Sequence, residues 1–181
     1  RAYGLELLLK KNTGRNQFWI SYTLSKSEQK TPGISHDESG INNGKWYLTP
    51  YDKTHDVSIN SKFKINEKLT LNGNFIFQTG QPTNYPNAQY QYMNLSVPNY
   101  GLRNSNRLPN YHRLDLSLSL VPKKNINKKV NSEWVFGIYN LYNRDNASSI
   151  LFRKNDQTLK NEAVQISIFG IVPSITYNFN F

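Results

Sequence analysis

The sequence predicts an all-β fold, an antiparallel transmembrane β-barrel of which this chain supplies about seven C-terminal strands. Three observations predict it: apolar side chains recur at every second residue, short and long connections alternate, and aromatic residues cluster near the segment ends. The mean hydropathy of −0.67 fits no helical membrane protein. A barrel strand needs only about 9 to 11 residues with alternate apolar positions, so its average hydropathy is low.

The period-two pattern defines seven segments, each with an apolar and a polar side. Leucines 114, 116, 118 and 120, for example, alternate with Arg113, Asp115, Ser117 and Ser119. The sixth segment is expected to continue through residues 150–152, and Gly170 is expected to form a β-bulge before the last segment. The segments cover residues 3–9, 18–24, 57–65, 69–78, 113–120, 133–142 and 175–181.

The connections alternate in length. Residues 11–15 and 66–68 are short, and 122–131 is moderately short, whereas 28–53 and 79–110 are long and rich in Pro, Gly, Asn and Tyr. Outer-membrane barrels show this asymmetry because their periplasmic turns are tight and their extracellular loops are long.

Aromatic residues form two predicted belts that flank an aliphatic middle, as in the girdles of membrane barrels. The belt at the short-turn end is expected to contain Phe18, Trp19, Phe63, Trp134 and Phe179. The belt at the other end is expected to contain Tyr22, Phe77, Tyr111 and Tyr139.

The polar sides of the segments are rich in Ser, Thr, Asn and Lys, which is typical of a wet barrel lumen. A soluble sandwich that buries the Leu and Phe sides against each other is the alternative. Seven strands also leave two open edges, which cost several kcal/mol per polar group in hydrocarbon. We therefore expect pairing with upstream barrel strands or with another chain.

Charge and cysteine content narrow the classes of function. The chain has a net charge of +10 but its lysines lie near the predicted turns, so we expect no nucleic-acid partner. It has no Cys, which excludes disulfides and thiolate metal sites.

Several motifs resemble the late barrel of TonB-dependent receptors of the Bacteroidota type, in the expected order and over nearly the whole chain. The chain ends on alternating aromatic residues, Tyr177, Phe179 and Phe181, similar to the C-terminal strand of that family. The internal motifs are Gly4-Leu5-Glu6-Leu7-Leu8-Leu9-Lys10-Lys11, Ile20-Ser21-Tyr22-Thr23-Leu24-Ser25, Tyr51-Asp52-Lys53-Thr54-His55-Asp56, Gln78-Thr79-Gly80-Gln81-Pro82, Arg107-Leu108-Pro109-Asn110-Tyr111-His112-Arg113-Leu114-Asp115 and Tyr139-Asn140-Leu141-Tyr142-Asn143.

The resemblance implies a 22-stranded barrel in the bacterial outer membrane, with residues 1–181 as its C-terminal part and no plug domain among them. It implies import of a substrate captured by extracellular loops, powered through TonB. The implied partners are the upstream strands and plug, TonB through the absent N-terminal part, the barrel-assembly machinery, a surface lipoprotein, and outer-membrane lipid. Residues Tyr177, Phe179 and Phe181 resemble the signal that the assembly machinery reads.

Candidate sites follow from side chains that share a face. Asp56, Arg113 and Asp115 are expected to form a polar network on the lumen wall. The histidines His36, His55 and His112 lack the spacing of a zinc site, and we expect no metal and no other cofactor. No arrangement resembles a catalytic site, so we expect a protein that is not an enzyme.

Aromatic residues in the long connections are candidates for substrate contact, because flat rings bury area with little entropy loss. Packing of the loops over one another is the alternative. Arg103 and Arg107 are candidates for contact with lipopolysaccharide. The loop aromatics are Trp46, Tyr47, Tyr85, Tyr90, Tyr92 and Tyr100.

Two further functions remain open on the sequence alone. One is a porin or surface-adhesion barrel without a plug, and the other is a soluble β-sandwich binding module. A plug and a TonB-contacting segment upstream would separate a transporter from a porin, and extraction from membranes would separate both from a soluble module.

Overall fold

The computed structural model describes residues 1–35, 37–93, 95–122, 131–155, 157–158 and 160–180. These residues form β-strands and one short 3-10 turn, η1 (Ile41–Gly44), and no α-helix occurs within the described ranges. None of the described helical segments has the length and apolar content to cross a membrane.

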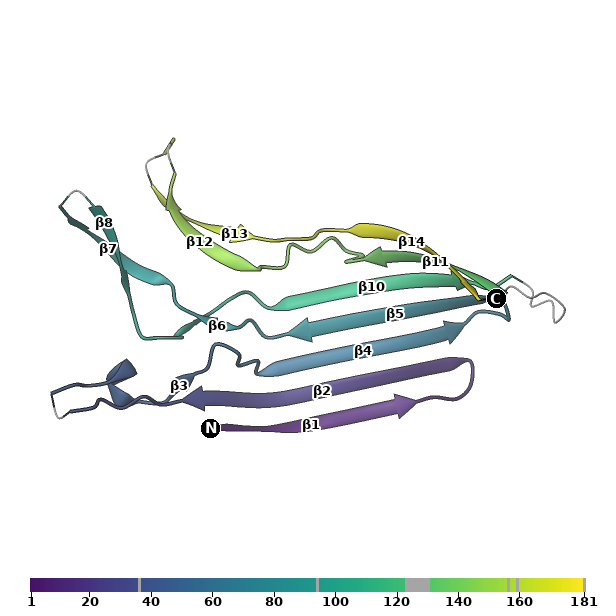
Figure 1. The fold of residues 1–181 in the computed structure, drawn as a ribbon, viewed down its shortest axis with the longest axis horizontal. Coiled ribbons are helices and arrows are strands. Elements are labelled where there is room, and N and C mark those ends of the chain that lie inside the picture. Colours follow the sequence, from purple (N-terminus) through teal and green to yellow (C-terminus); the bar gives the residue numbers. More distant parts are fainter. Residues whose placement is uncertain (36, 94, 123–130, 156, 159, 181) are drawn as a thin grey trace.

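One curved antiparallel sheet contains the seven long strands in the order β1-β2-β4-β5-β10-β11-β14 (Figure 1). All seven strands match the segments predicted from the period-two pattern. Within the described residues the sheet does not close on itself, because β1 and β14 are its two edges. The strands span Ala2–Lys11 (β1), Asn16–Gln29 (β2), His55–Lys64 (β4), Leu69–Gln78 (β5), Tyr111–Leu120 (β10), Asn131–Tyr139 (β11) and Val172–Asn180 (β14).

The long connections carry small strands of their own. Two hairpins, β7-β8 and β12-β13, rise from one end of the sheet (Figure 1). A two-residue strand extends the end of β2, and another short pair forms beneath the first hairpin. These strands are β3 (Tyr47–Leu48), β6 (Pro82–Thr83), β7 (Pro86–Tyr92), β8 (Leu95–Tyr100), β9 (Asn106–Arg107), β12 (Ser149–Lys154) and β13 (Asn161–Ile166).

Two boundary predictions are wrong. Residues 150–152 do not continue the sixth strand, because β11 ends at Tyr139 and β12 pairs only with β13. Gly170 is not a bulge in a ladder; it lies in the connection between β13 and β14. The side chain of Asn143 accepts a hydrogen bond from the Ile171 N–H at 2.8 Å, and a Cβ on Gly170 would approach that same Asn143 oxygen to 2.6 Å. Close approach of another chain segment is therefore the physical reason for this glycine.

The short turns lie at one end of the sheet and the long connections at the other (Figure 1). Side chains close the short turns locally. Asn66 accepts hydrogen bonds from the N–H groups of Lys68 and Leu69, both at 2.8 Å, and so stabilises the β4-β5 turn. Gly14 takes a positive φ of 86° in the β1-β2 turn.

The strand register separates two unlike faces. Ile20, Ile59 and Phe75 align across β2, β4 and β5, whereas Asn60 and Asn74 align on the opposite face. The pairing of β5 with β10 continues both rows, placing Leu114 beside Phe75 and Asp115 beside Asn74. Because each strand keeps this parity, one face of the sheet is apolar and the other is mostly polar.

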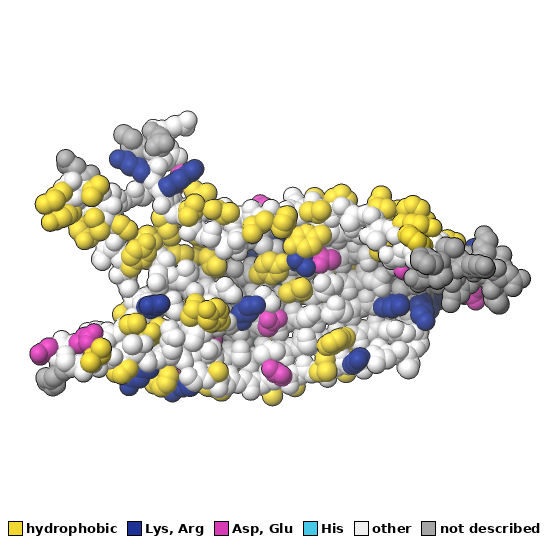
Figure 2. All heavy atoms as spheres, viewed as in Figure 1, with side chains coloured by type: hydrophobic (Ala, Val, Ile, Leu, Met, Phe, Trp, Pro, Cys, Tyr) yellow, Lys and Arg dark blue, Asp and Glu magenta, His cyan; other side chains and the backbone are white. Residues whose placement is uncertain are grey.

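The polar faces of the seven strands curve around a common hollow of about 530 Å3. We call this side of the sheet the hollow face and the opposite side the outer face. Figure 2 shows mostly backbone and uncharged polar side chains, drawn white, over the middle of the molecule, with hydrophobic side chains gathered over the hairpins and along the upper edge.

The outer face is not covered. Leu5, Leu7, Phe136 and Ile175 are exposed there, and among the described residues Tyr47 is the one hydrophobic side chain that is buried. The apolar faces of the strands therefore do not meet across a dry sandwich core in this structure.

The aromatic belts need a correction. Phe18, Phe63, Tyr22 and Phe77 lie on the outer face, as predicted, and so does Trp134, which is paired with Tyr177. Three predicted belt residues do not lie there: Trp19 aligns with Asn60, Tyr111 with Gln78, and Tyr139 with Val172, all on the hollow face. The parity of each strand, not the residue type, decides the face.

Candidate functional site

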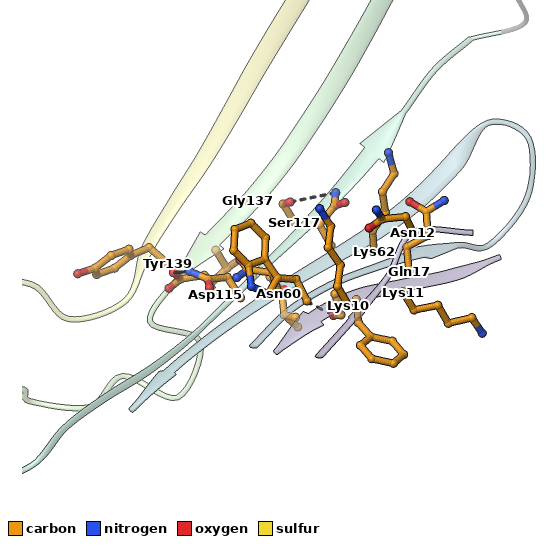
Figure 3. Close-up of a pocket in the computed structure, with 18 of the residues that line it drawn as sticks. Lys10, Lys11, Asn12, Gln17, Asn60, Lys62, Asp115, Ser117, Gly137 and Tyr139 are labelled. Carbon is orange, nitrogen blue, oxygen red and sulfur yellow. Dashed lines mark hydrogen bonds between the residues drawn. The ribbon is translucent and has the colours of Figure 1, made fainter. Parts of the chain in front are cut away.

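The hollow face is the candidate site because side chains from all seven strands of the sheet converge on it. Its walls are rich in amides and hydroxyls, and Figure 3 shows them around a common space. One residue from each strand, in sheet order, is Lys10, Gln17, Asn60, Asn74, Ser117, Tyr139 and Ser174.

Arg113 organises one end of this face. Its guanidinium forms an ion pair with Asp115 at 2.9 Å and donates hydrogen bonds to the hydroxyls of Tyr111 at 2.8 Å and Tyr139 at 2.6 Å. The guanidinium carbon also lies 3.9 Å from the centre of the Tyr139 ring. A charged donor paired with a carboxylate and two hydroxyls fixes the geometry of the wall strongly.

Asp115 links this cluster to the connection that follows β11. Its Oδ1 oxygen, which also pairs with Arg113, accepts a hydrogen bond from the Asn140 N–H at 2.9 Å. Asn140 is fully buried and has a φ of 53°. Its side chain donates a hydrogen bond to the Arg144 carbonyl at 2.9 Å and accepts one from the Arg144 N–H at 3.1 Å. Asparagine tolerates this left-handed backbone and holds the tight turn.

Asp56 lies on the same face but in a separate group. It accepts a hydrogen bond from the side-chain amide of Gln78 at 3.0 Å, and Lys53 donates to the side-chain oxygen of the same residue at 2.9 Å. The predicted polar network is therefore present as two groups. Among the described residues, no hydrogen bond or ion pair joins Asp56 to Arg113 or Asp115.

The most buried charge was not among the predicted site residues. Asp52 is 1% exposed, accepts a hydrogen bond from the Ser27 N–H at 2.6 Å, and forms an ion pair with Arg107. Arg107 also donates to the Gly80 carbonyl at 2.8 Å and to the Thr54 hydroxyl at 3.1 Å. We call this group the loop clamp: Ser27, Asp52, Thr54, Gly80 and Arg107.

The loop clamp unites three of the sequence motifs, those that begin at Tyr51, Gln78 and Arg107. It joins the connection after β2 to the one after β5, across 55 residues of sequence. Two signals could have indicated it: a carboxylate and an arginine that each lie just before a predicted strand and at the start of one of these motifs. Because Arg107 is occupied in the clamp, it is poorly placed for the lipopolysaccharide contact expected of it.

The loop aromatics fall into two groups. Tyr47 is 6% exposed and bonds Thr31, and Tyr85 donates to the Arg107 carbonyl at 3.0 Å. Burial also raises the pKa of the Tyr85 hydroxyl. These two residues pack the connections together. The others are exposed: Trp46, which contacts Arg1, and Tyr90, Tyr92 and Tyr100 on the β7-β8 hairpin.

The histidines lie apart from one another. His55 bonds the Tyr22 hydroxyl at 3.0 Å and His112 bonds the Tyr142 hydroxyl at 2.7 Å, both on the outer face. His36 lies outside the described residues. The part of the chain that the structure describes contains no group of three or more His, Cys, Asp or Glu suited to a metal ion.

The residues that resemble an assembly signal lie on β14. The Tyr177 ring contacts Trp134 with 4.6 Å between ring centres and Phe179 with 6.0 Å. This aromatic group is at the short-turn end of the outer face. Phe181 lies outside the described residues.

Comparison with models of known protein families gave no match, and searches of curated proteins and of solved structures gave none either.

Proposed function

We propose that this chain is part of the wall of an outer-membrane TonB-dependent transporter, which binds a substrate at its long connections and imports it into the periplasm. The observation that carries the proposal is the sorting of side chains by the curved sheet. Each of the seven long strands contributes polar side chains to the hollow face, and the outer face exposes Leu, Ile and Phe. A sheet with water inside and acyl chains outside needs this arrangement.

The position of the connections supports the same proposal. The long connections and their hairpins lie at one end of the sheet, and the loop clamp holds two of them together. Exposed aromatic side chains on the β7-β8 hairpin offer contact area beyond the mouth of the hollow. The two open edges, β1 and β14, would pair with further strands in a closed barrel.

Extraction from native membranes tests the location. We expect the native protein to remain with the outer-membrane fraction in high salt and at alkaline pH, and to leave it only in detergent. Release by salt alone would contradict a membrane barrel and would favour a soluble or peripheral binding module.

Cross-linking in intact cells tests the coupling to TonB. We expect a cross-linked product that contains both the native protein and TonB, because a transporter of this class makes that contact from its upstream part. A protein that fractionates with the outer membrane but gives no such product would favour the porin or adhesion alternative.

Substitution of two exposed rings tests the substrate-binding part of the proposal. Tyr90 and Tyr92 are 55% and 58% exposed and lie on one face of β7. Replacing both with Ala is expected to reduce uptake at limiting substrate without changing the amount of protein in the membrane. Tyr47, which is buried, is the contrasting position, since its replacement is expected to lower the amount of folded protein instead.

A further inference from the structure

Two lysines of the hollow face stand without a carboxylate partner. Lys10 and Lys62 line the hollow, from β1 and β4, and Figure 3 shows them extending over the hollow side of the sheet while Lys11 extends away. No salt bridge involves Lys10, Lys62 or the nearby Lys64 among the described residues. Their neighbours on the face are the amides Gln17, Asn60 and Asn72.

The acids of the same face do not neutralise these lysines. Asp115 is held by Arg113, Asn74 and the Asn140 N–H. Asp56 is held by Gln78 and faces Lys53, and Glu133 accepts a hydrogen bond from Asn178. Glu6 of β1 aligns with Thr23 near the long-connection end of the same face, and among the described residues it forms no salt bridge with Lys10. The short-turn half of the hollow face therefore carries an excess of positive charge, from Lys10, Lys62 and Lys64 against Glu133.

A tryptophan lies between the two lysines. Trp19 of β2 pairs with Lys10 on one side and with Asn60 on the other, and Gln17, two residues before it, pairs with Lys62. The Lys10 ammonium lies 5.5 Å from the centre of the Trp19 ring, and the ring is 49% exposed. The exposed indole offers a flat apolar surface, next to two ammonium groups, that a side chain of another molecule can cover.

We propose that this patch, Lys10, Trp19 and Lys62, is the docking site for an acidic protein segment that lies in the hollow, with carboxylates against the lysines and an apolar side chain on the indole. Because the patch is positively charged, its partner is expected to be acidic. Because the indole offers an apolar contact, a protein segment with an apolar side chain fits the patch better than a free anion does. This inference rests on one part of the proposed function, namely that the hollow face is the inner side of a barrel wall.

Binding of a defined probe to the full chain in detergent micelles tests the proposal. The probe is a short fluorescent peptide in which glutamates flank a leucine, and its twin carries glutamine at each glutamate. We expect the glutamate peptide to bind, its affinity to fall as salt screens the charges, and the glutamine twin to bind at least about tenfold more weakly.

Matched variants locate the site. Lys10→Gln with Lys62→Gln is expected to weaken binding of the glutamate peptide by about tenfold, because two charge contacts are lost. Lys30→Gln with Lys45→Gln removes the same charge from exposed positions in the connection after β2 and is expected to change affinity by less than about twofold. Circular dichroism monitors the fold of each variant.

A third variant tests the indole. Trp19→Ala is expected to lower the affinity for the glutamate peptide by about threefold or more, while the salt dependence of that affinity stays unchanged. Equal affinities for the two double variants, or an unaltered affinity in Trp19→Ala, would overturn the proposal. So would tighter binding of a single-stranded oligonucleotide than of the glutamate peptide. These outcomes are independent of the membrane extraction and TonB cross-linking results, so the two proposals fail separately.

Discussion

The two faces of the sheet are made by the same strands, but their side chains differ in polarity and in how many contacts they make. On the hollow face, polar side chains bond one another: Arg113 binds a carboxylate and two tyrosine hydroxyls, and Gln78 bridges Lys53 and Asp56. On the outer face, Leu5, Leu7 and Ile175 touch little protein and remain exposed. Under the proposed function, this difference would match the hollow face to water and the outer face to hydrocarbon.

The largest expected effect comes from placing a charge in the middle of each face. Ile59 and Asn60 are neighbours at the centre of β4, on the outer and the hollow face respectively. In lipid vesicles, Ile59→Arg is expected to lower the free energy of unfolding by about 2 to 4 kcal/mol, because the guanidinium would enter hydrocarbon. Asn60→Arg is expected to change it by less than about 0.5 kcal/mol. Denaturant titration measures both, and equal costs would erase the distinction between the faces.

The next effect concerns the loop clamp, which lies beside the polar end of β2. Asp52→Ala leaves the Arg107 guanidinium and the Ser27 N–H without their buried partner. We expect the free energy of unfolding to fall by about 2 to 3 kcal/mol. This is less than the full cost of breaking a buried ion pair, because the Arg107 side chain is 28% exposed.

Limited proteolysis of this variant should show faster cleavage within residues 30–54 and 79–110 while the long strands stay protected. An exposed acid in the same connection, Glu38→Ala, is the control. Cleavage of the strands at the same rate as the connections would show that the clamp supports the whole sheet and not the connections alone.

A smaller effect compares two tyrosine hydroxyls on opposite faces. Tyr139 accepts from a charged guanidinium on the hollow face, whereas Tyr142 bonds the ring of His112 on the outer face. Tyr139→Phe is expected to lower the free energy of unfolding by about 1.5 kcal/mol, and Tyr142→Phe by about 0.5 to 1 kcal/mol. The reverse order in denaturant titrations would mean that the hollow-face network is weaker than its distances suggest.

The smallest effect is that of pH on the β12-β13 hairpin, which belongs to neither face. Hydrogen bonds from Asn155 and then from Arg153 hold the pKa of the Glu162 carboxyl below its ordinary value. The stabilisation by these bonds is complete above the unfolded-state pKa and is lost as pH falls through the lowered folded-state pKa. An NMR titration should show the Glu162 midpoint rising in Asn155→Ala. An unchanged midpoint would show that the hydrogen bond from Asn155 does not lower the pKa of Glu162.

Much of the sheet could be predicted from the sequence because each strand pattern is local. The alternation around Leu114 to Leu120 determines the two faces of β10 without any knowledge of its neighbours. Residue type alone is misleading: it predicts aromatic belts that include Trp19, Tyr111 and Tyr139, although their parity puts them on the hollow face. Parity was the better guide wherever the two disagreed.

The loop clamp and the turn at Asn140 could not be predicted in the same way. Asp52 and Arg107 meet only after β2, β4 and β5 bring two distant connections together, and no periodicity records that contact. The positive φ of Asn140 depends on bonds to Arg144 and Asp115, which are formed in three dimensions. The hairpins β7-β8 and β12-β13 lie in segments whose sequence signals suggested only long loops and an uncertain strand boundary.

The most direct test of the central claim uses the absence of native cysteine in this chain. Single cysteines placed at 114, 115, 116, 117, 118 and 119 of β10 in a lipid bilayer should react alternately with a water-soluble thiol reagent. We expect rapid labelling at 115, 117 and 119, where the side chains face water, and protection at 114, 116 and 118, where they face lipid. Uniform labelling, or protection at 115, 117 and 119 instead, would contradict this expectation.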